Sequence, residues 1–421
     1  MQASDILNMS KNTKKTKKNK KTSKTQRKPI SKKTKIIIAS IIAGIILLAG
    51  IISTVLVIRK KINDRIVRVA FYGLSEDVCE LIKQKAPVLE EVKFSFDVIP
   101  EKGADTAMLK KKYDMLFTWK GELTDSLAEV SNNIPDKILS YIPRSLRDNK
   151  CMPLMLDHYE MDYSVSVVEK LGYNIEAGFD GFMSYLDKSK QYAFSPFFCV
   201  GSDDRTLLAF TGSLIESFGG KDAYLSFLAR LKNESDFEKL LDTALDSENL
   251  SLRSVLDFLK TLPEQGMLHP DWNKGNKQDL LFFAKQKQMS AFYTSLSEHR
   301  TIPFDSIRNF ESARFPIKKY GIAHAEICPA IGCVLISDNS NGVKYLQNLI
   351  DMDTQAEFSN RTMLAPVHYQ AEAYDRQADD VRFYAASNAS VLPDPALAVY
   401  QRNSEAMSAL ASEIRKYLAA R

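Results

Sequence analysis

The sequence lacks the short motifs that mark common catalytic and nucleotide-binding sites. Its five histidines show no H-E-x-x-H spacing, no serine stands in G-x-S-x-G, and neither G-x-x-x-x-G-K-[ST] nor G-x-G-x-x-G occurs. These patterns carry zinc hydrolysis, acyl transfer and phosphate binding. Asp157 and Glu160 form a pair of carboxylates, but spacing alone does not indicate a glycosidase. We therefore predict no enzyme activity, no catalytic residue and no cofactor.

Cysteine is scarce and scattered. The chain has five cysteines and no C-x-x-C, which excludes a disulfide framework and a cysteine zinc site, so we predict no metal site. An isolated cysteine usually behaves as a small buried apolar residue. A bridge between Cys328 and Cys333 stays open as an alternative.

Outside the N-terminal region the sequence has too few basic residues to balance its acidic ones. Sixteen of the 57 Lys and Arg residues but only one of the 52 acidic residues lie in residues 1–61, which leaves residues 62–421 with a net charge of −10. An acidic domain of this kind gives no reason to expect nucleic acid as a partner. Residues 1–35 are rich in Lys, Ser, Thr and Asn without aromatics, a composition that predicts a disordered basic tail.

Charge is absent from residues 36–58, a run of 23 apolar or small residues. A helix of this length extends about 35 Å, enough to cross a membrane. Thirteen Lys or Arg residues precede it within residues 11–35 and three follow it, so the positive-inside bias predicts a cytoplasmic N-terminus. We expect one uncleaved transmembrane helix that anchors an extracytoplasmic domain to the cytoplasmic membrane; cleavage as a signal peptide is the alternative.

Residues 66–421 contain no internal repeat and no long flexible linker. About 360 residues exceed what one hydrophobic core usually supports, so two closely joined lobes are expected. Strand-like runs alternate with helical patterns in the first part, which predicts an α/β fold with a mostly parallel sheet. The strand-like runs cover residues 66–72, 92–99, 113–117, 151–156, 289–293 and 327–337.

Helical periodicity dominates the second half of the chain. Ser75 and the acidic residues before Arg205 are placed as caps at the starts of two helices, and Gly219-Gly220 is placed as a helix stop. The helical patterns cover residues 163–171, 179–188, 205–218, 223–231, 236–245, 250–262, 277–287, 341–352 and 404–418.

Five segments resemble the extracytoplasmic solute-binding proteins of ATP-driven importers, in the group of maltose-binding protein. YDMLFTW (113–119) is similar to the "PDI" strand that ends at the ligand cleft, and PLMLD (153–157) with Tyr163 is similar to the first crossing between lobes. Phe197-Phe198 through Gly219-Gly220 resembles the strand and cleft-facing helix of the second lobe. FAKQKQM (283–289) resembles the step into the second crossing, and TMLAP (362–366) a late turn.

The resemblance implies a two-lobed, periplasmic-binding-protein-like fold with several inter-lobe crossings, preceded by the transmembrane helix. It places residues 66–154 and 291–338 in lobe 1, and residues 157–288 and 340–421 in lobe 2. Two departures weaken any transfer of ligand specificity: Tyr163-Ser164 replaces a Tyr-Asn pair, and Gln286-Lys287 replaces Gly-Lys.

The same resemblance points to residues that would line a ligand cleft. Trp119 follows a strand at the edge where ligands bind in such sheets, and a flat aromatic there can stack on a sugar ring or help to pack the lobe. Arg205 at a helix start can bind an anionic group, although capping alone explains the acidic residues beside it. The full predicted lining is Trp119, Asp157, His158, Tyr159, Tyr163, Asp203, Arg205, Tyr293 and Ser295.

Two functions remain open at this stage. The first is a tethered receptor that captures a small solute, with carbohydrate as one class, for the permease subunits of an importer. The second is a sensor or cell-envelope interaction module that keeps the binding fold and transports nothing. The sequence does not name the ligand, because specificity depends on side-chain placement.

Overall fold

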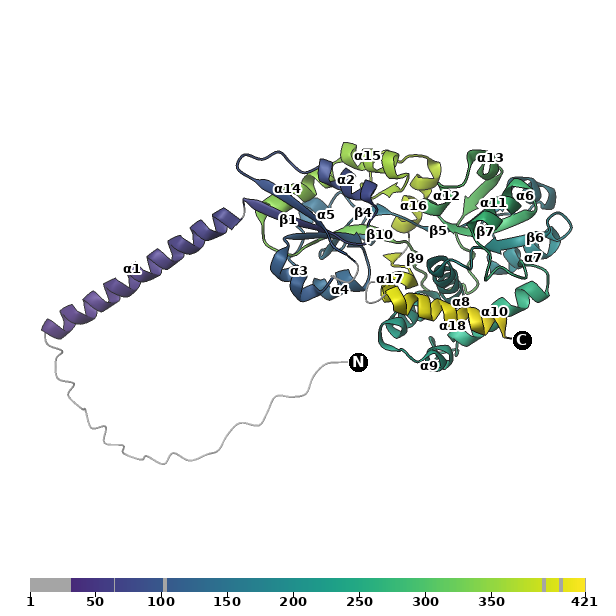
Figure 1. Cartoon of the computed structure of the whole chain (residues 1–421), viewed down its shortest axis with the longest axis horizontal. Coiled ribbons are helices and arrows are strands. Elements are labelled where there is room, and N and C mark those ends of the chain that lie inside the picture. Colours follow the sequence, from purple (N-terminus) through teal and green to yellow (C-terminus); the bar gives the residue numbers. More distant parts are fainter. Residues whose placement is uncertain (1–31, 64, 101–103, 388–390, 401–403, 421) are drawn as a thin grey trace, which may run out of the picture. The chain divides into compact units, whose positions relative to one another are not determined.

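The computed structural model describes residues 32–63, 65–100, 104–387, 391–400 and 404–420. Contacts divide the chain into two units, residues 1–61 and residues 62–421, and the second unit carries both lobes (Figure 1). Residues 1–31 of the expected basic tail lie outside the described part.

The expected membrane anchor is contradicted. Helix α1 (Lys32–Asn63) covers residues 36–58, but among the described residues no helix is both long enough and apolar enough to span a membrane. The predicted transmembrane helix is therefore not found. The predicted location, with a cytoplasmic N-terminus and an anchored extracytoplasmic domain, is wrong as well.

Lobe 1 is built on a six-stranded sheet. Buried apolar runs form its central strands, while the edge strand β2 alternates between exposed and half-buried residues. Strands β1, β2 and β3 pair in parallel, whereas β10 runs antiparallel between β3 and β4, so the sheet is mixed rather than mostly parallel. The order is β11 (Ala365–Pro366), β4 (Cys151–Leu156), β10 (Ala330–Leu335), β3 (Met115–Trp119), β1 (Ile66–Phe71) and β2 (Lys93–Val98).

Helices cover both faces of this sheet, as Figure 1 shows for α2 and α14 on one side and α3 and α4 on the other. Phe71 and Phe117 pack on the first face with Tyr345, and Leu116 packs on the second with Leu127. The helices of this lobe are α2 (Glu76–Gln84), α3 (Thr106–Lys112), α4 (Glu122–Ala128), α5 (Asp136–Leu139), η2 (Arg144–Leu146), α14 (Ser340–Leu349), α15 (Met352–Thr362) and α16 (Arg376–Ser387).

Lobe 2 is built on a four-stranded sheet with its own core. Strand β5 pairs antiparallel with β7 and with β8, and β6 pairs in parallel with β7. Every residue of β5, β6 and β7 is buried, since helices cover both faces. The order is β6 (Ser195–Cys199), β7 (Met289–Ser295), β5 (Tyr159–Ser164) and β8 (Phe310–Ala313).

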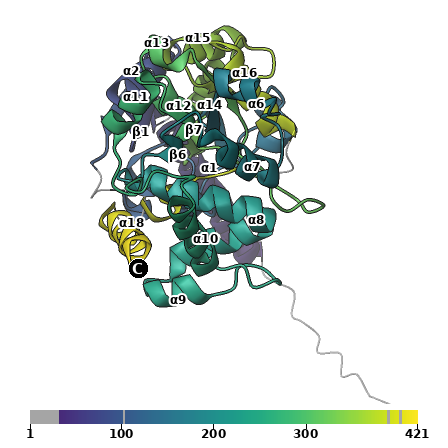
Figure 2. The same ribbon diagram turned by 90° about the vertical axis from the view of Figure 1, so that its right-hand side faces the viewer.

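The helices of lobe 2 form two groups. One packs with Phe197 and Tyr293 in the larger core, where α18 lies beside α8 and α10 (Figure 2), and the other packs with Phe198 and Phe292. The set is α6 (Val165–Leu171), α7 (Phe179–Ser189), α8 (Asp204–Asn233), α9 (Phe237–Asp242), α10 (Leu252–Glu264), α11 (Lys277–Lys285), α12 (Leu296–His299), α13 (Phe304–Ile307), α17 (Pro395–Tyr400) and α18 (Ser404–Ala419).

Within the described part of the chain, three segments join the lobes, as the family resemblance implies. The first links β4 to β5 through Asp157 and His158, and the second links β9 (Glu326–Ile327) to β10. The third contains β12 (Val391–Leu392), which pairs with β9 and lies in the chain between α16 of lobe 1 and α17 of lobe 2. We call the boundary between the lobes the seam.

The division of the chain between the lobes differs from the expected one at two places. Residues 291–313 belong to lobe 2, because β7 bonds along its length to β5 and β8 bonds to β5. Residues 340–387 belong to lobe 1, because Tyr345, Phe358 and Val381 pack in its core. The alternative of a Cys328–Cys333 bridge is also settled, since all five cysteines are buried and free.

Candidate functional site

One contact across the seam joins an aromatic ring of lobe 1 to a cation of lobe 2. Trp119 ends β3 at the carboxyl edge of its sheet, and Arg205 is the second residue of α8. The Cζ atom of Arg205 lies 4.9 Å from the centroid of the Trp119 ring. A guanidinium at this distance is attracted by the negative face of the ring. Two of the predicted lining residues therefore meet.

Asp394 holds Arg205 in this position. Its Oδ2 atom lies 2.9 Å from Nε and 2.8 Å from Nη2 of Arg205, and it accepts a hydrogen bond of 3.2 Å from the Tyr159 hydroxyl. Asp394 is fully buried and its other oxygen accepts from the Leu397 amide at the start of α17. Burial opposes the charge on Arg205, but Asp394 outweighs it and raises the arginine pKa further. Arg205 is thus charged at any physiological pH.

Tyr159 turns its hydroxyl toward the seam and its ring into lobe 2. The ring stacks on Tyr293 with centroids 5.5 Å apart and an angle of 4° between planes. Burial and the charge of Asp394 raise the pKa of Tyr159 well above its ordinary value, so its hydroxyl stays a hydrogen-bond donor. Tyr293 itself is fully buried and bonds to Ser213 at 2.8 Å. The ring of Tyr293 therefore packs against Tyr159 on the side that faces the core of lobe 2.

Asp157 ties the first crossing to helix α12. Its carboxylate accepts from the Ser297 hydroxyl at 2.6 Å, from the Ser297 amide at 3.0 Å and from the His158 amide at 2.9 Å. Ser295 caps the same helix by accepting from the Glu298 amide at 3.2 Å. Both side chains are therefore engaged in fixing the crossing in this conformation.

The remaining predicted residues have structural partners. Asp203 caps α8 by accepting from the Thr206 amide at 2.7 Å, which is the capping role that the sequence indicated as the simpler one. His158 is buried with Nδ1 3.0 Å from Glu326; burial opposes its charge, but the carboxylate raises its pKa. Tyr163 is buried in the core of lobe 2 against Tyr185.

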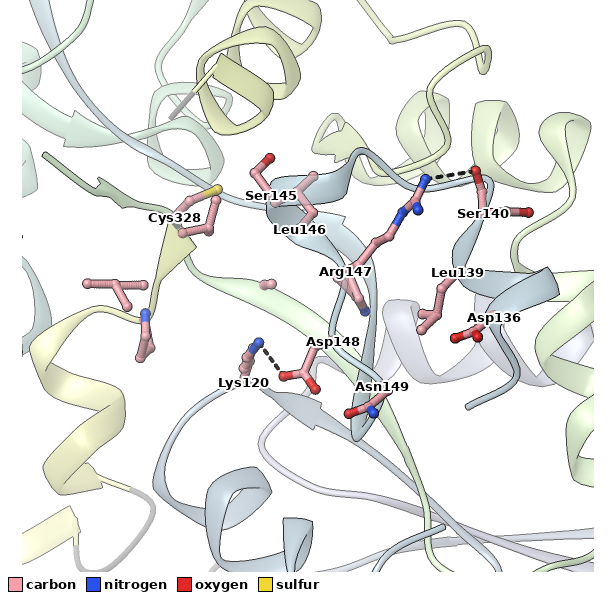
Figure 3. A pocket seen from close by; sticks show the side chains of 15 residues that line it. Lys120, Asp136, Leu139, Ser140, Ser145, Leu146, Arg147, Asp148, Asn149 and Cys328 are labelled. Atoms are coloured by element: carbon pink, nitrogen blue, oxygen red, sulfur yellow. Dashed lines mark hydrogen bonds and ion pairs between the residues drawn. The ribbon is translucent and has the colours of Figure 1, made fainter. Parts of the chain in front are cut away.

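Trp119, Tyr159, Arg205 and Asp394 together form the seam cluster. An open cavity of about 680 Å³ lies next to this cluster (Figure 3). It shares two chain segments with the cluster, because Lys120 follows Trp119 and Pro393 precedes Asp394. Its polar walls include Lys120 and Asp148, which form an ion pair of 2.6 Å; burial alone would raise the pKa of Asp148, but Lys120 lowers it. The full lining is Lys120, Asp136, Leu139, Ser140, Ser145, Leu146, Arg147, Asp148, Asn149, Pro153, Cys328, Ala330, Val391, Leu392 and Pro393.

The most important residue that the sequence did not reveal is Asp394. Asp394 lies 189 positions from Arg205 in the sequence. The residues beside it indicate only the start of a helix with proline at the first position. Lys120 and Asp148 were missed for the same reason, because their pairing depends on how the chain returns to the sheet edge.

No family model matches the sequence, and no curated protein matches it significantly. Solved structures, in contrast, match over most of the chain. The bacterial solute receptor AcbH, described as having an exclusive preference for β-D-galactopyranose, has a TM-score of 0.64 at 14% identity and covers 84% of this chain and 96% of its own. Its fold and that of the present chain are the same.

Two further neighbours support the same assignment of the fold. The binding protein MsmE from Bacillus subtilis, in an open conformation, has a TM-score of 0.60 at 13% identity and covers 84% of this chain and 92% of its own. Maltose-bound MalE3 from T. maritima has a TM-score of 0.52 at 14% identity, with 84% and 98% covered. These neighbours are binding proteins rather than enzymes, and at such identities the likeness concerns the fold.

Proposed function

We propose that this chain captures a small polyhydroxylated solute, of the carbohydrate class, at the seam between its lobes and presents it to an ATP-driven importer. The observation that carries the proposal is the contact of Arg205 on Trp119, which brings an aromatic platform and an anchored charge together between the lobes. Among the neighbours with this fold, AcbH is described as a solute receptor, MsmE as a binding protein and MalE3 as bound to maltose.

Trp119 and Arg205 suit different parts of a sugar ring. The ring of Trp119 can stack on the apolar C–H face, and Arg205 with Asp394 can form charge-assisted hydrogen bonds to hydroxyl groups at its edge. In the conformation described, the guanidinium covers the ring. A solute must therefore take the place of the guanidinium on Trp119, which requires the lobes to separate and close again.

The cavity beside the seam gives the solute room. Its volume of about 680 Å³ falls in the usual range of ligand sites, about 300–1,000 Å³. Lys120, Asp148 and Asn149 supply donors and acceptors along one wall. A solute larger than one sugar ring would extend from Trp119 into this cavity.

Thermal unfolding of the full-length protein in the presence of a panel of mono- and oligosaccharides tests the proposal. At least one sugar should raise the Tm in a concentration-dependent way, because a ligand that binds only the folded state stabilises it. Trp119→Ala should weaken that sugar's affinity at least about tenfold through the loss of stacking. Phe304→Ala, which removes a ring that is 74% exposed on lobe 2, is the control and should leave the shift unchanged.

One observation favours the second function, a non-transporting sensor or interaction module. Arg205, which Asp394 holds within lobe 2, already covers the ring of Trp119 in lobe 1, so the closed seam has a stabilising contact made by the chain itself. If no solute shifts the Tm of the wild-type protein or of Arg205→Ala, the receptor proposal fails and this second function is favoured.

A further inference from the structure

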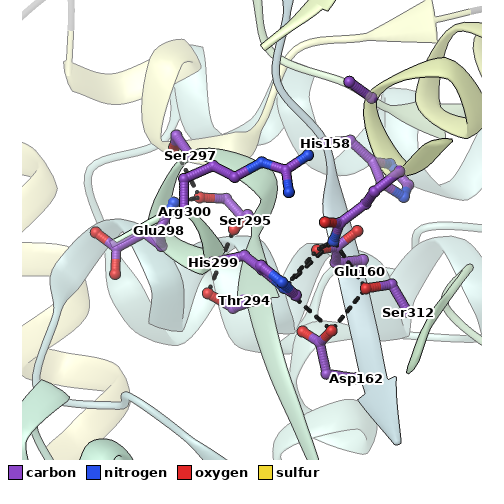
Figure 4. Close-up of polar contacts among 12 residues, drawn as sticks. His158, Glu160, Asp162, Thr294, Ser295, Ser297, Glu298, His299, Arg300 and Ser312 are labelled. Atoms are coloured by element: carbon purple, nitrogen blue, oxygen red, sulfur yellow. Dashed lines mark hydrogen bonds and ion pairs between the residues drawn. The ribbon is translucent and has the colours of Figure 1, made fainter. Parts of the chain in front are cut away.

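Three side chains with metal-binding atoms, none of which belongs to the predicted ligand lining, meet in lobe 2 (Figure 4). Glu160 and Asp162 lie two residues apart on β5, so they project from the same face of the strand. His299 ends the short helix that follows β7. Their exposed fractions are 2%, 0% and 8%, so the group lies in the interior.

A fourth polar group comes from the other lobe. The side-chain amide nitrogen of Gln377, on α16, contacts the Glu160 carboxylate and lies 3.2 Å from Nδ1 of His299 and 2.7 Å from the Ser312 hydroxyl. The Ser312 hydroxyl in turn donates to Oδ1 of Asp162 at 2.7 Å. A half-turn of the amide would place its carbonyl oxygen where the nitrogen lies.

Hydrogen bonds alone do not satisfy the polar atoms of Glu160, Asp162 and His299. Nδ1 of His299 lies 3.2 Å from Oε1 of Glu160 and 3.1 Å from Oδ1 of Asp162, yet one N–H can serve only one of these oxygens well. Oδ2 of Asp162 is buried and has no hydrogen-bond partner within the described part of the chain. A buried carboxylate oxygen without a partner is costly, and a cation within reach of Oδ2 would remove that cost.

The distances from Nδ1 of His299 fit a shared metal ion. Four ligands bound at about 2.0 Å in a tetrahedron lie about 3.3 Å from one another. The separations of 3.1 and 3.2 Å between Nδ1 and the two carboxylates, and of 3.2 Å between Nδ1 and the Gln377 amide, are close to this edge length. One imidazole nitrogen with carboxylate oxygens suits a divalent first-row ion better than calcium, which takes six to eight oxygens.

We propose that Glu160, Asp162 and His299 bind a divalent transition-metal ion, with Zn²⁺ the best fit, and that the Gln377 carbonyl closes the shell. Two carboxylates would neutralise the ion, and bidentate binding by Asp162, through both Oδ1 and Oδ2, would also give Oδ2 a partner. A cavity of about 230 Å³ borders Glu160, His299 and Gln377 and gives the ion a route of entry.

The site would act on the relative position of the lobes. Its carboxylates and imidazole belong to lobe 2, whereas Gln377 lies on α16, which packs in the core of lobe 1 with Ala378 and Val381. A bound ion therefore fastens the two lobes together, independently of any solute at Trp119.

The test uses the full-length protein, stripped with a chelator and titrated with ZnCl₂, MnCl₂ and CaCl₂ by calorimetry and thermal unfolding. We expect one equivalent of Zn²⁺ to bind and raise the Tm, with Ca²⁺ bound far more weakly. Asp162→Asn and His299→Gln should each lower the Zn²⁺ affinity at least tenfold. Glu311→Gln removes an exposed carboxylate that lines the same cavity and should retain the affinity.

Cobalt gives a second readout that does not depend on the folding of the variants. Co²⁺ added to the wild-type protein should produce the visible absorption of a tetrahedral site with nitrogen and oxygen ligands. The proposal is overturned if the wild-type protein binds no stoichiometric Zn²⁺, if Glu311→Gln loses binding as Asp162→Asn does, or if Co²⁺ shows only the spectrum of the hydrated ion.

Discussion

At the scale of single residues, the seam depends on a charge that is only partly shielded from water. Asp394 is fully buried, whereas the Arg205 side chain keeps 34% of its surface exposed. Leaving Asp394 without a partner would therefore cost more free energy than leaving Arg205 without one, because an unpaired charge is costly mainly when it is buried. The stabilising effect of the pair thus comes chiefly from keeping Asp394 partnered.

Asp394→Asn should lower the free energy of unfolding by roughly 2–3 kcal/mol. Breaking a fully buried pair costs about 3–5 kcal/mol, and water can reach part of the remaining guanidinium, which reduces the loss. Urea unfolding at neutral pH measures it. Asp242→Asn in the exposed pair with Arg253, where the closest atoms are 2.5 Å apart, is the control and should lower the free energy of unfolding much less, because water screens an exposed pair. Equal losses in both variants would contradict the account.

Residue by residue, the sequence revealed helix caps better than binding partners. Ser75 and Asp203 cap α2 and α8 as predicted, because a cap depends on residues two or three positions away. Trp119 and Arg205 were predicted as neighbours of one cleft, since each follows a strand that ends at the seam. Asp394 could not be paired with Arg205, because nothing local in the sequence records a contact between distant segments.

At the scale of elements, strand positions were predictable and strand partners were not. The expected strand at residues 66–72 is β1, and the one at 289–293 is β7. A strand that is buried on both faces carries the same apolar run whichever sheet it joins. Residues 291–313 were therefore placed in lobe 1, although hydrogen bonds to β5 place them in lobe 2.

The predicted helix stop at Gly219-Gly220 is a kink within α8. Gly220 has φ 73° and ψ −170°, a conformation that few residues other than glycine adopt. The kink allows the Lys221 amide to bond at 2.8 Å to the carbonyl of Ala323, in the segment before β9. A Cβ atom at position 220 would lie 2.7 Å from that carbonyl oxygen.

Gly220→Ala should therefore destabilise the protein more than backbone strain alone. We expect a loss of about 2–3 kcal/mol, the sum of positive-φ strain and the close contact. Gly266→Ala is the matched control, since Gly266 has φ 68° but open space around its Cβ position, and it should cost about 1 kcal/mol. Chemical denaturation compares the two variants, and a smaller loss in Gly220→Ala than in Gly266→Ala would contradict this explanation.

At the scale of the whole molecule, the two lobes and their crossings were predicted from pattern resemblance, and the fold of solved solute receptors confirms the two-lobed α/β architecture. The ligand could not be predicted, because the residues that meet at the seam come from β3, α8 and the segment before α17. The cluster of Glu160, Asp162 and His299 was also missed, since its members gather only when β5 and α12 pack together.

Tryptophan fluorescence tests the central claim, capture of a solute on Trp119, most directly. The chain has only two tryptophans, and Trp272 is 2% exposed in the core of lobe 2 beside Phe210. In the full-length Trp272→Phe variant, Trp119 is the sole reporter. The account predicts a saturable change in emission with the sugar that raises the Tm of the wild-type protein. A sugar that binds and stabilises the protein without changing the emission of Trp119 would contradict it.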